Sequence, residues 1–129
     1  MYKVILAVAI LLGAALYFPQ TRPVVAETLA PVMNPVFTWQ TKGEMGRIRR
    51  ELETLQREGD FFPAPGEGFQ RWMNRNFLGR ARSDAWGMDY TLRVWRDSVG
   101  VVSNGPDLEI ETSDDIILSL VVPGQGRRR

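Results

Sequence analysis

The sequence predicts an α+β fold, in which amphipathic helices pack on one face of a small three-stranded antiparallel sheet. Two observations support this prediction. Between residues 41 and 78 apolar side chains recur at intervals of three or four, which is typical of helices lying on a core. After Gly87 the period changes to two and β-branched residues become frequent, which is typical of strands. We also expect the hydrophobic N-terminal segment to form a helix.

The first helix of the domain is predicted to begin at Thr41. Thr41 and Glu44 have the spacing of a capping box, in which each side chain bonds a free backbone amide of the first turn. The apolar stripe that follows consists of Met45, Ile48, Leu52 and Leu55. Gly59 is placed to end this helix.

A second helix is predicted over residues 69–78, where aromatic residues alternate with arginine. Its apolar residues are Phe69, Trp72, Met73 and Phe77, and the arginines around it are Arg71, Arg75, Arg80 and Arg82. Arginine beside aromatic residues can bind nucleic acid by stacking and phosphate contact. A short core helix with arginine on its wet side is the simpler interpretation, because the apolar residues keep one periodic face.

Three short strands are predicted to follow. Alternation over residues 88–95 predicts the first, the β-branched run at residues 99–104 the second, and the apolar run at residues 116–122 the third. Residues 123–129 read as a polar basic tail.

The N-terminal 40 residues differ from the rest of the chain. Residues 1–18 contain an uncharged run that suits either a membrane anchor or a signal peptide cleaved near Ala26, with a buried core helix as a third possibility. Both of the first two interpretations place the remaining chain outside the cytoplasm. Four of the eight prolines lie between Pro19 and Pro35, so residues 19–40 are predicted to be an extended linker.

Composition limits the chemistry. The chain has 129 residues, a formal net charge of +1, no Cys and no His. Thiol nucleophiles, disulfides, Cys-ligated zinc and the usual neutral-pH general base are therefore excluded. Any metal would be a hard cation held by oxygen. We expect a protein that is not an enzyme and has no small-molecule substrate.

An acidic segment separates the last two predicted strands. Five of the 15 acidic residues lie between Asp107 and Asp115, with no basic residue among them. Gly105 and Pro106 predict a tight turn just before them. If the flanking strands pair, Asp107 approaches Asp114 and Asp115, and their oxygens suit Ca²⁺. The residues themselves leave two interpretations open, a solvated acidic loop and a cation site; the spacing is not that of an EF-hand.

Three ordered motifs resemble one family. They are "DAWGMDY" at residues 84–90, "VVSNGPD" at residues 101–107 and "TSDDI" at residues 112–116. Together they are similar to the C-terminal half of the major pseudopilin of type II secretion, the G-subunit family. The "FFP" at residues 61–63 resembles the Tyr-Pro that follows the long helix of that family, and the resemblance covers residues 41–122.

The resemblance implies a helix packed on a three-stranded antiparallel sheet, with a calcium ion in the loop before the last strand. It also implies a ligand set: the carboxylates of Asp107, Asp114 and Asp115, the carbonyl of Asn104 and, as further ligands, Thr112 and the carbonyl of Glu109. The implied protein is a pseudopilin-like part of the bacterial envelope, with a domain in the periplasm and other pseudopilin or secretion subunits as partners. Residues 1–18 would contact the inner membrane.

The chain departs from this family inside the matched region and upstream of it. Leu108 stands where the family usually has Gly, and Ala85 replaces a Pro. Family members begin with a short basic leader ending in Gly, followed by Phe-Thr-Leu-x-Glu; here Gly13 is followed by Ala14 and the first acid is Glu27. We therefore expect a pseudopilin-like domain that lacks the prepilin leader. The alternative function is a periplasmic module that binds an anionic partner, DNA or lipid headgroups, through residues 69–82.

Overall fold

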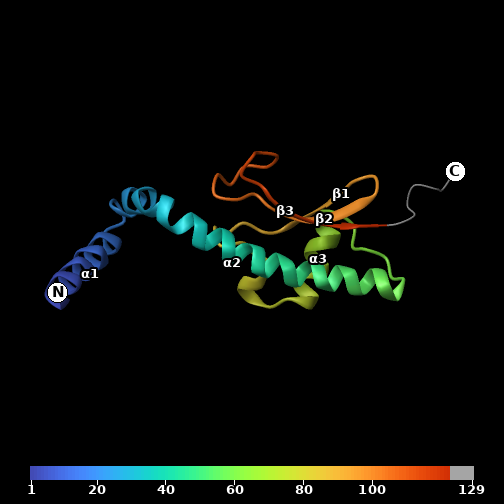
Figure 1. The fold of residues 1–129 in the computed structure, drawn as a ribbon, viewed down its shortest axis with the longest axis horizontal. Coiled ribbons are helices and arrows are strands. Elements are labelled where there is room, and N and C mark those ends of the chain that lie inside the picture. Colours follow the sequence, from blue (N-terminus) through green and yellow to red (C-terminus); the bar gives the residue numbers. More distant parts are fainter. Residues whose placement is uncertain (123–129) are drawn as a thin grey trace. The chain divides into compact units, whose positions relative to one another are not determined.

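The computed structural model describes residues 1–122, without the side chains of residues 16, 25 and 26. The predicted basic tail at residues 123–129 lies outside this part. The chain divides into two compact units, Met1–Val36 and Phe37–Arg129. Figure 1 shows the helices and the sheet.

In the N-terminal unit, helix α1 comprises Tyr2–Tyr17, and those of its large apolar side chains that the structure describes are exposed. Among residues 1–122, no helix combines the length and the apolar character needed to cross a membrane. The roles assigned to residues 1–18 therefore remain predictions.

Helix α2 comprises Arg22–Glu58. The extended conformation that we predicted for the linker at residues 19–40 is therefore wrong. Pro23 lies in the first turn, where backbone amides have no intrahelical partner and a proline removes nothing. Pro31 and Pro35 lie inside the helix and each removes one hydrogen bond, yet the helix continues past both. The helix expected to begin at Thr41 is thus the second half of a longer one.

The end of α2 agrees with the prediction. Gly59 has φ 76°, its amide donates to the Gln56 carbonyl at 3.3 Å, and the Asp60 amide donates to the Leu55 carbonyl at 2.9 Å. This pair of bonds is a Schellman motif, which glycine favours because its left-handed backbone meets no Cβ. The predicted stripe is also confirmed, since Met45, Ile48 and Leu52 are buried and Leu55 is half-buried against them.

Helix α3 comprises Glu67–Asn76 and is followed by the 3₁₀ helix η1, Gly79–Arg82. Phe69, Trp72 and Met73 on α3 are buried. The core-helix interpretation of this segment is therefore confirmed for its apolar residues.

The three strands form one antiparallel sheet in the order β1-β2-β3. Their bounds are Thr91–Val94, Ser98–Ser103 and Ile116–Val121. Strand β1 begins three residues later than predicted, because residues 84–88 form a turn instead. The register places Leu92 opposite Val101 in the first pair and Val101 opposite Leu118 in the second.

Helices α2 and α3 lie beside the sheet (Figure 1), and one apolar core joins the three. Its buried members are Met45, Ile48, Leu52, Phe69, Trp72, Met73, Tyr90, Leu92, Val99, Val101 and Ile116. The long helix packed on a small three-stranded sheet is the predicted α+β architecture. Strand β2 is the central strand and is buried along almost its whole length, so the loops at its ends are held close to the core.

Candidate functional site

A buried carboxylate organises the turn before β1. Asp84 is 5% exposed, and its Oδ1 accepts hydrogen bonds from the backbone amides of Trp86 at 3.1 Å and Met88 at 2.9 Å. Gly87 has φ 89°, which a residue with a Cβ rarely adopts, so the turn needs glycine there. The first motif is thus a tight turn built around Asp84.

The same carboxylate connects the first motif to the second. Ser103, the last residue of β2, donates from its Oγ to Asp84 Oδ2 at 2.7 Å, and both residues are buried. Ser103 Oγ also accepts from the Gly105 amide at 3.2 Å. A charged acceptor strengthens such bonds, so these contacts fix the start of the β2–β3 loop to the turn at residues 84–88.

Gly105 connects the second motif to the third. It has φ 69°, and a Cβ at this position would lie 2.2 Å from the carbonyl oxygen of Asp114. Glycine is therefore required by the backbone conformation and by the close approach of the other end of the loop. The three motifs, which are spread over residues 84–116, meet at one place.

Thr41 and Glu44, which were predicted to cap a helix, instead accept hydrogen bonds from residues of this turn and from Tyr90, which follows it. The buried Thr41 accepts at its Oγ1 from the Ala85 amide at 3.1 Å, and Glu44 accepts at Oε2 from the Tyr90 hydroxyl at 2.9 Å. The capping-box prediction is wrong because α2 continues upstream and leaves no free amides at this point. The pKa of Tyr90 lies far above its usual value. Burial is the largest cause, and the hydrogen bond to Glu44 and the charge of Glu44 raise the pKa further.

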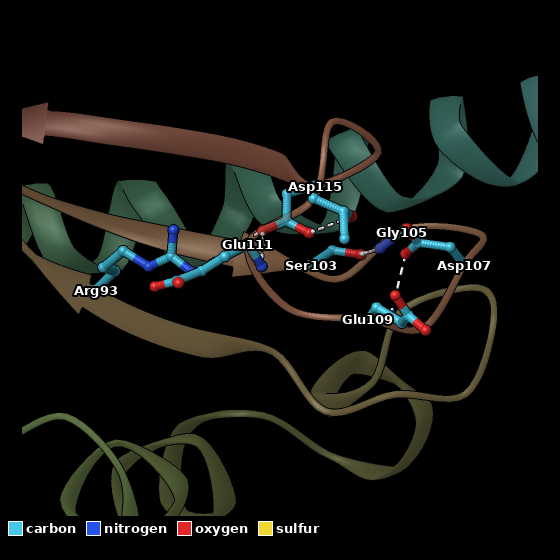
Figure 2. Close-up of polar contacts among 8 residues, drawn as sticks. Arg93, Ser103, Gly105, Asp107, Glu109, Glu111 and Asp115 are labelled. Carbon is cyan, nitrogen blue, oxygen red and sulfur yellow. Dashed lines mark hydrogen bonds and ion pairs between the residues drawn. The ribbon is translucent and has the colours of Figure 1, made fainter.

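The acidic residues of the β2–β3 loop do different things at its two ends (Figure 2). Asp107 is exposed, and its Oδ1 accepts only a local bond from the Glu109 amide at 3.0 Å. The Asp115 side chain is 4% exposed and accepts from the Glu111 amide at 2.9 Å and from Thr112 Oγ1 at 3.3 Å. Its Oδ2 also lies 3.9 Å from an Arg93 guanidinium nitrogen.

The predicted metal ligands are not gathered around one point. Across residues 1–122, no group of three or more acidic side chains is placed to hold a metal ion. Asp107 and Asp114 are exposed, and Asp115 already has partners within the protein. The predicted ligands have the right chemistry for Ca²⁺, and the calcium site remains a prediction.

Asn104 is the predicted ligand with an unmet requirement. It is 6% exposed, and its Oδ1 has no hydrogen-bond partner among the described residues. A buried carbonyl oxygen without a partner costs free energy, so this atom is suited to accept a bond from a ligand or water. Glu109 is exposed, and the hydroxyl of Thr112 is engaged by Asp115.

Two residues of the loop have a left-handed backbone despite carrying side chains. Leu108 has φ 61° and Glu111 has φ 62°. The turn after Asp107 therefore adopts the glycine conformation that the resemblance implies at Leu108, at a cost of about 1–2 kcal/mol.

The segment predicted as an alternative binding surface is divided between core and solvent. Its aromatic rings serve the core: Phe69 and Trp72 are buried and stacked with centroids 5.8 Å apart, and Phe77 packs on Trp72 at 5.7 Å. Arg71, Arg75 and Arg80 are exposed. Stacking of bases on these aromatic rings is thus not available in this fold, although the exposed charges remain.

Sequence reasoning did not identify the role of Asp84. The usable signal was an Asp three residues before a Gly, directly ahead of a strand, since this pattern is typical of side-chain-stabilised turns.

A scan against protein-family models, a search of curated proteins and a search of solved structures each find no match to this chain.

Proposed function

We propose that this chain is a non-catalytic, pseudopilin-like protein of the bacterial envelope, associated with type II secretion or a pilus-type assembly. In this proposal residues 1–18 reach the inner membrane or direct export, and the domain that follows lies in the periplasm. Its partners are other pseudopilin or secretion subunits. The globular unit serves as a rigid assembly module.

The observation that carries the proposal is the meeting of the three motifs at Asp84, Ser103 and Gly105. These residues lie in the motifs on which the pseudopilin resemblance rests, and each has a specific structural task. Buried polar contacts of this kind fix one arrangement of a small core. The helix-on-sheet architecture supports the same proposal.

The proposal is tested by location and by loss of function in the bacterium that encodes the chain. Alkaline phosphatase fused after Val122 should be active, because that enzyme works only outside the cytoplasm. Deletion of the gene should lower the amount of secreted protein measured by quantitative mass spectrometry of the culture medium. Complementation with the intact chain should restore it, whereas Gly105→Ala, which strains the motif cluster, should not.

An inactive phosphatase fusion, with an active fusion to a known exported protein as control, would refute the envelope location. Normal secretion after deletion would refute the link to secretion. The two parts of the proposal can therefore fail separately.

The calcium part of the proposal rests on Asn104 Oδ1 and on two of the exposed carboxylates of the loop, those of Asp107 and Asp114. We expect Ca²⁺ to recruit Asp107 and Asp114 toward Asn104, while Asp115 keeps its protein partners. Extracellular oxygen sites bind Ca²⁺ with Kd of about 10⁻⁴ to 10⁻³ M. At ten times Kd such an ion stabilises the folded protein by about 1.4 kcal/mol.

Thermal unfolding with 5 mM Ca²⁺, with 5 mM Mg²⁺ and with chelator tests this expectation. Ca²⁺ should raise the Tm of the intact chain, and the double variant Asp107→Ala, Asp114→Ala should lose that rise. The double variant Glu109→Ala, Glu111→Ala removes the same charge from the same loop and should keep it. An equal response of both double variants, or no response of the intact chain, would remove calcium from the proposal.

A further inference from the structure

We propose that the free edge of β3 binds a second copy of this chain, so that two β3 strands pair antiparallel about a twofold axis at Ser119. The proposal goes beyond the assembly role and rests on the described globular unit, residues 37–122.

The register identifies the outward-facing groups of β3. The Val122 amide donates to the Asp97 carbonyl at 2.9 Å, so Val122 points toward β2. Backbone groups alternate along an antiparallel strand, which turns the amides and carbonyls of Ile117, Ser119 and Val121 away from β2. Since β3 is an edge strand of the sheet described here, these groups face outward.

This edge has few of the devices that prevent pairing. Strand β3 has six residues and contains no charge and no proline, whereas the opposite edge strand β1 has only four residues and carries Arg93. Short length and charge are common protections of edge strands. On the sheet face opposite the helices, Ile117 and Val121 are 43% and 68% exposed.

The sequence of β3 is nearly palindromic, which points to a second copy rather than to another strand. Residues 117–121 read "ILSLV" about the central Ser119. In a twofold pair, Ile117 faces Val121 of the partner and Leu118 faces Leu120 of the partner, so apolar residues oppose each other on both faces. Such self-complementarity is what an isologous contact requires, and apolar cross-strand pairs stabilise a sheet.

A groove lies beside the edge. Leu120 lines it from β3, and six polar or charged residues line it from α2: Arg50, Glu51, Glu53, Thr54, Gln56 and Arg57. Gln56 Nε2 donates to the outward carbonyl of Val121 at 3.1 Å, and a carbonyl oxygen can accept a second bond from the partner strand.

Cysteine crosslinking of the full chain tests the pairing directly, because the chain contains no native Cys. The variant Ser119→Cys places two thiols opposite each other across the twofold axis, where the Cα separation of about 5.5 Å permits a disulfide. Mild oxidation of the purified chain should give a covalent dimer on a non-reducing gel. The control Thr91→Cys puts an exposed thiol on the β1 edge and should crosslink at least about tenfold more slowly.

A second pair of variants separates specific pairing from random collision. Adding Ile117→Lys to Ser119→Cys opposes Lys to apolar Val121 at both ends of the pair and should slow crosslinking about tenfold. Adding Thr91→Lys instead should leave the rate unchanged. Near-ultraviolet circular dichroism should show that each variant keeps the native fold.

Equal crosslinking of Ser119→Cys and Thr91→Cys would overturn the proposal, and so would a rate that Ile117→Lys does not lower. Crosslinking of Ser119→Cys only to a protein of another mass, in envelope extracts, would overturn the assignment of a second copy. Loss of secretion after gene deletion leaves this result unaffected, so the pairing and the proposed function are tested independently.

Discussion

The turn at residues 83–90 and the loop at residues 104–115 both contain acidic residues, but they use their carboxylates in opposite ways. In the turn, Asp84 is buried and accepts three hydrogen bonds. In the loop, Asp107 and Asp114 are exposed, and the buried Asp115 side chain is held by the Glu111 amide, the Thr112 hydroxyl and Arg93.

This difference teaches that local acid density is a poor guide to which carboxylate holds the structure. The isolated Asp84 connects two motifs, because buried donors surround it and require an acceptor. The crowded acids of the loop repel one another and mostly face water, where a carboxylate costs least. Four predictions test this comparison, from the largest expected effect to the smallest.

Asp84→Ala should lower the free energy of unfolding by about 4 kcal/mol, measured by urea titration at pH 7. The change leaves two backbone amides and the Ser103 hydroxyl without their acceptor, and bonds to a charged group are the stronger kind. Asp107→Ala is the matched control in the loop and should change stability by less than about 0.5 kcal/mol. If both variants lost the same free energy of unfolding, the two regions would not differ in how their carboxylates stabilise the fold.

Gly105→Ala should cost about 3 kcal/mol, since its Cβ would collide with the Asp114 carbonyl and its backbone is left-handed. Gly79→Ala separates the two causes. Gly79 has φ 55°, but a Cβ added there would meet no atom within 4 Å, so only the backbone cost of about 1–2 kcal/mol applies. Urea titrations that give the same loss for both variants would show that the contact between the loop ends is unimportant.

The stability of the turn should fall at alkaline pH because of Tyr90. Its folded-state pKa is raised by burial and by Glu44, so the folded protein holds this proton more tightly than the unfolded chain. The stabilisation is complete below the unfolded pKa of about 10 and decreases above it, by up to about 1.4 kcal/mol per pH unit.

Urea titrations between pH 9 and pH 12 measure this slope. Tyr90→Phe has no hydroxyl to titrate and should show a shallower decline, whereas Tyr17→Phe, a change at an exposed position, should match the intact chain. A decline that Tyr90→Phe leaves unchanged would assign the alkaline effect to other groups.

Leu108→Gly should raise stability by about 1 kcal/mol, because it relieves a left-handed backbone in the loop. Thermal unfolding should show a Tm increase of several degrees for a unit of this size. Leu108→Ala keeps the Cβ and should give no increase. A Tm that falls with Leu108→Gly would indicate that the exposed leucine side chain contributes more than the backbone strain costs.

Much of the fold could be predicted because burial imposes a period on the sequence. The stripe from Met45 to Leu55, the stop at Gly59 and the three strands all appear close to their predicted positions. The region upstream of Thr41 could not be predicted from its prolines. Pro23 lies in the first turn, where a proline removes no intrahelical hydrogen bond. At Pro31 and Pro35 the helix continues although each proline removes one such bond.

The site was predicted less well, because its contacts join residues distant in sequence. Thr41 and Glu44 match a local capping rule, yet they bind Ala85 and Tyr90 more than 40 positions away. Such partners leave no periodic signal. From the pairing of β2 with β3 we expected Asp107 to approach Asp114 and Asp115. The close approach that the structure shows is between Gly105 and the carbonyl of Asp114.

The unequal connections of the sheet have a consequence for the order in which the protein folds. Residues 95–97 join β1 to β2, and the Trp95 amide closes that turn on the Ser98 carbonyl at 2.8 Å, whereas residues 104–115 separate β2 from β3. Closing the longer connection costs about 1 kcal/mol more chain entropy. We expect the β1–β2 hairpin to form early and β3 to dock last. Nascent chains would then pass through a state in which β2 is paired with β1 but not yet with β3.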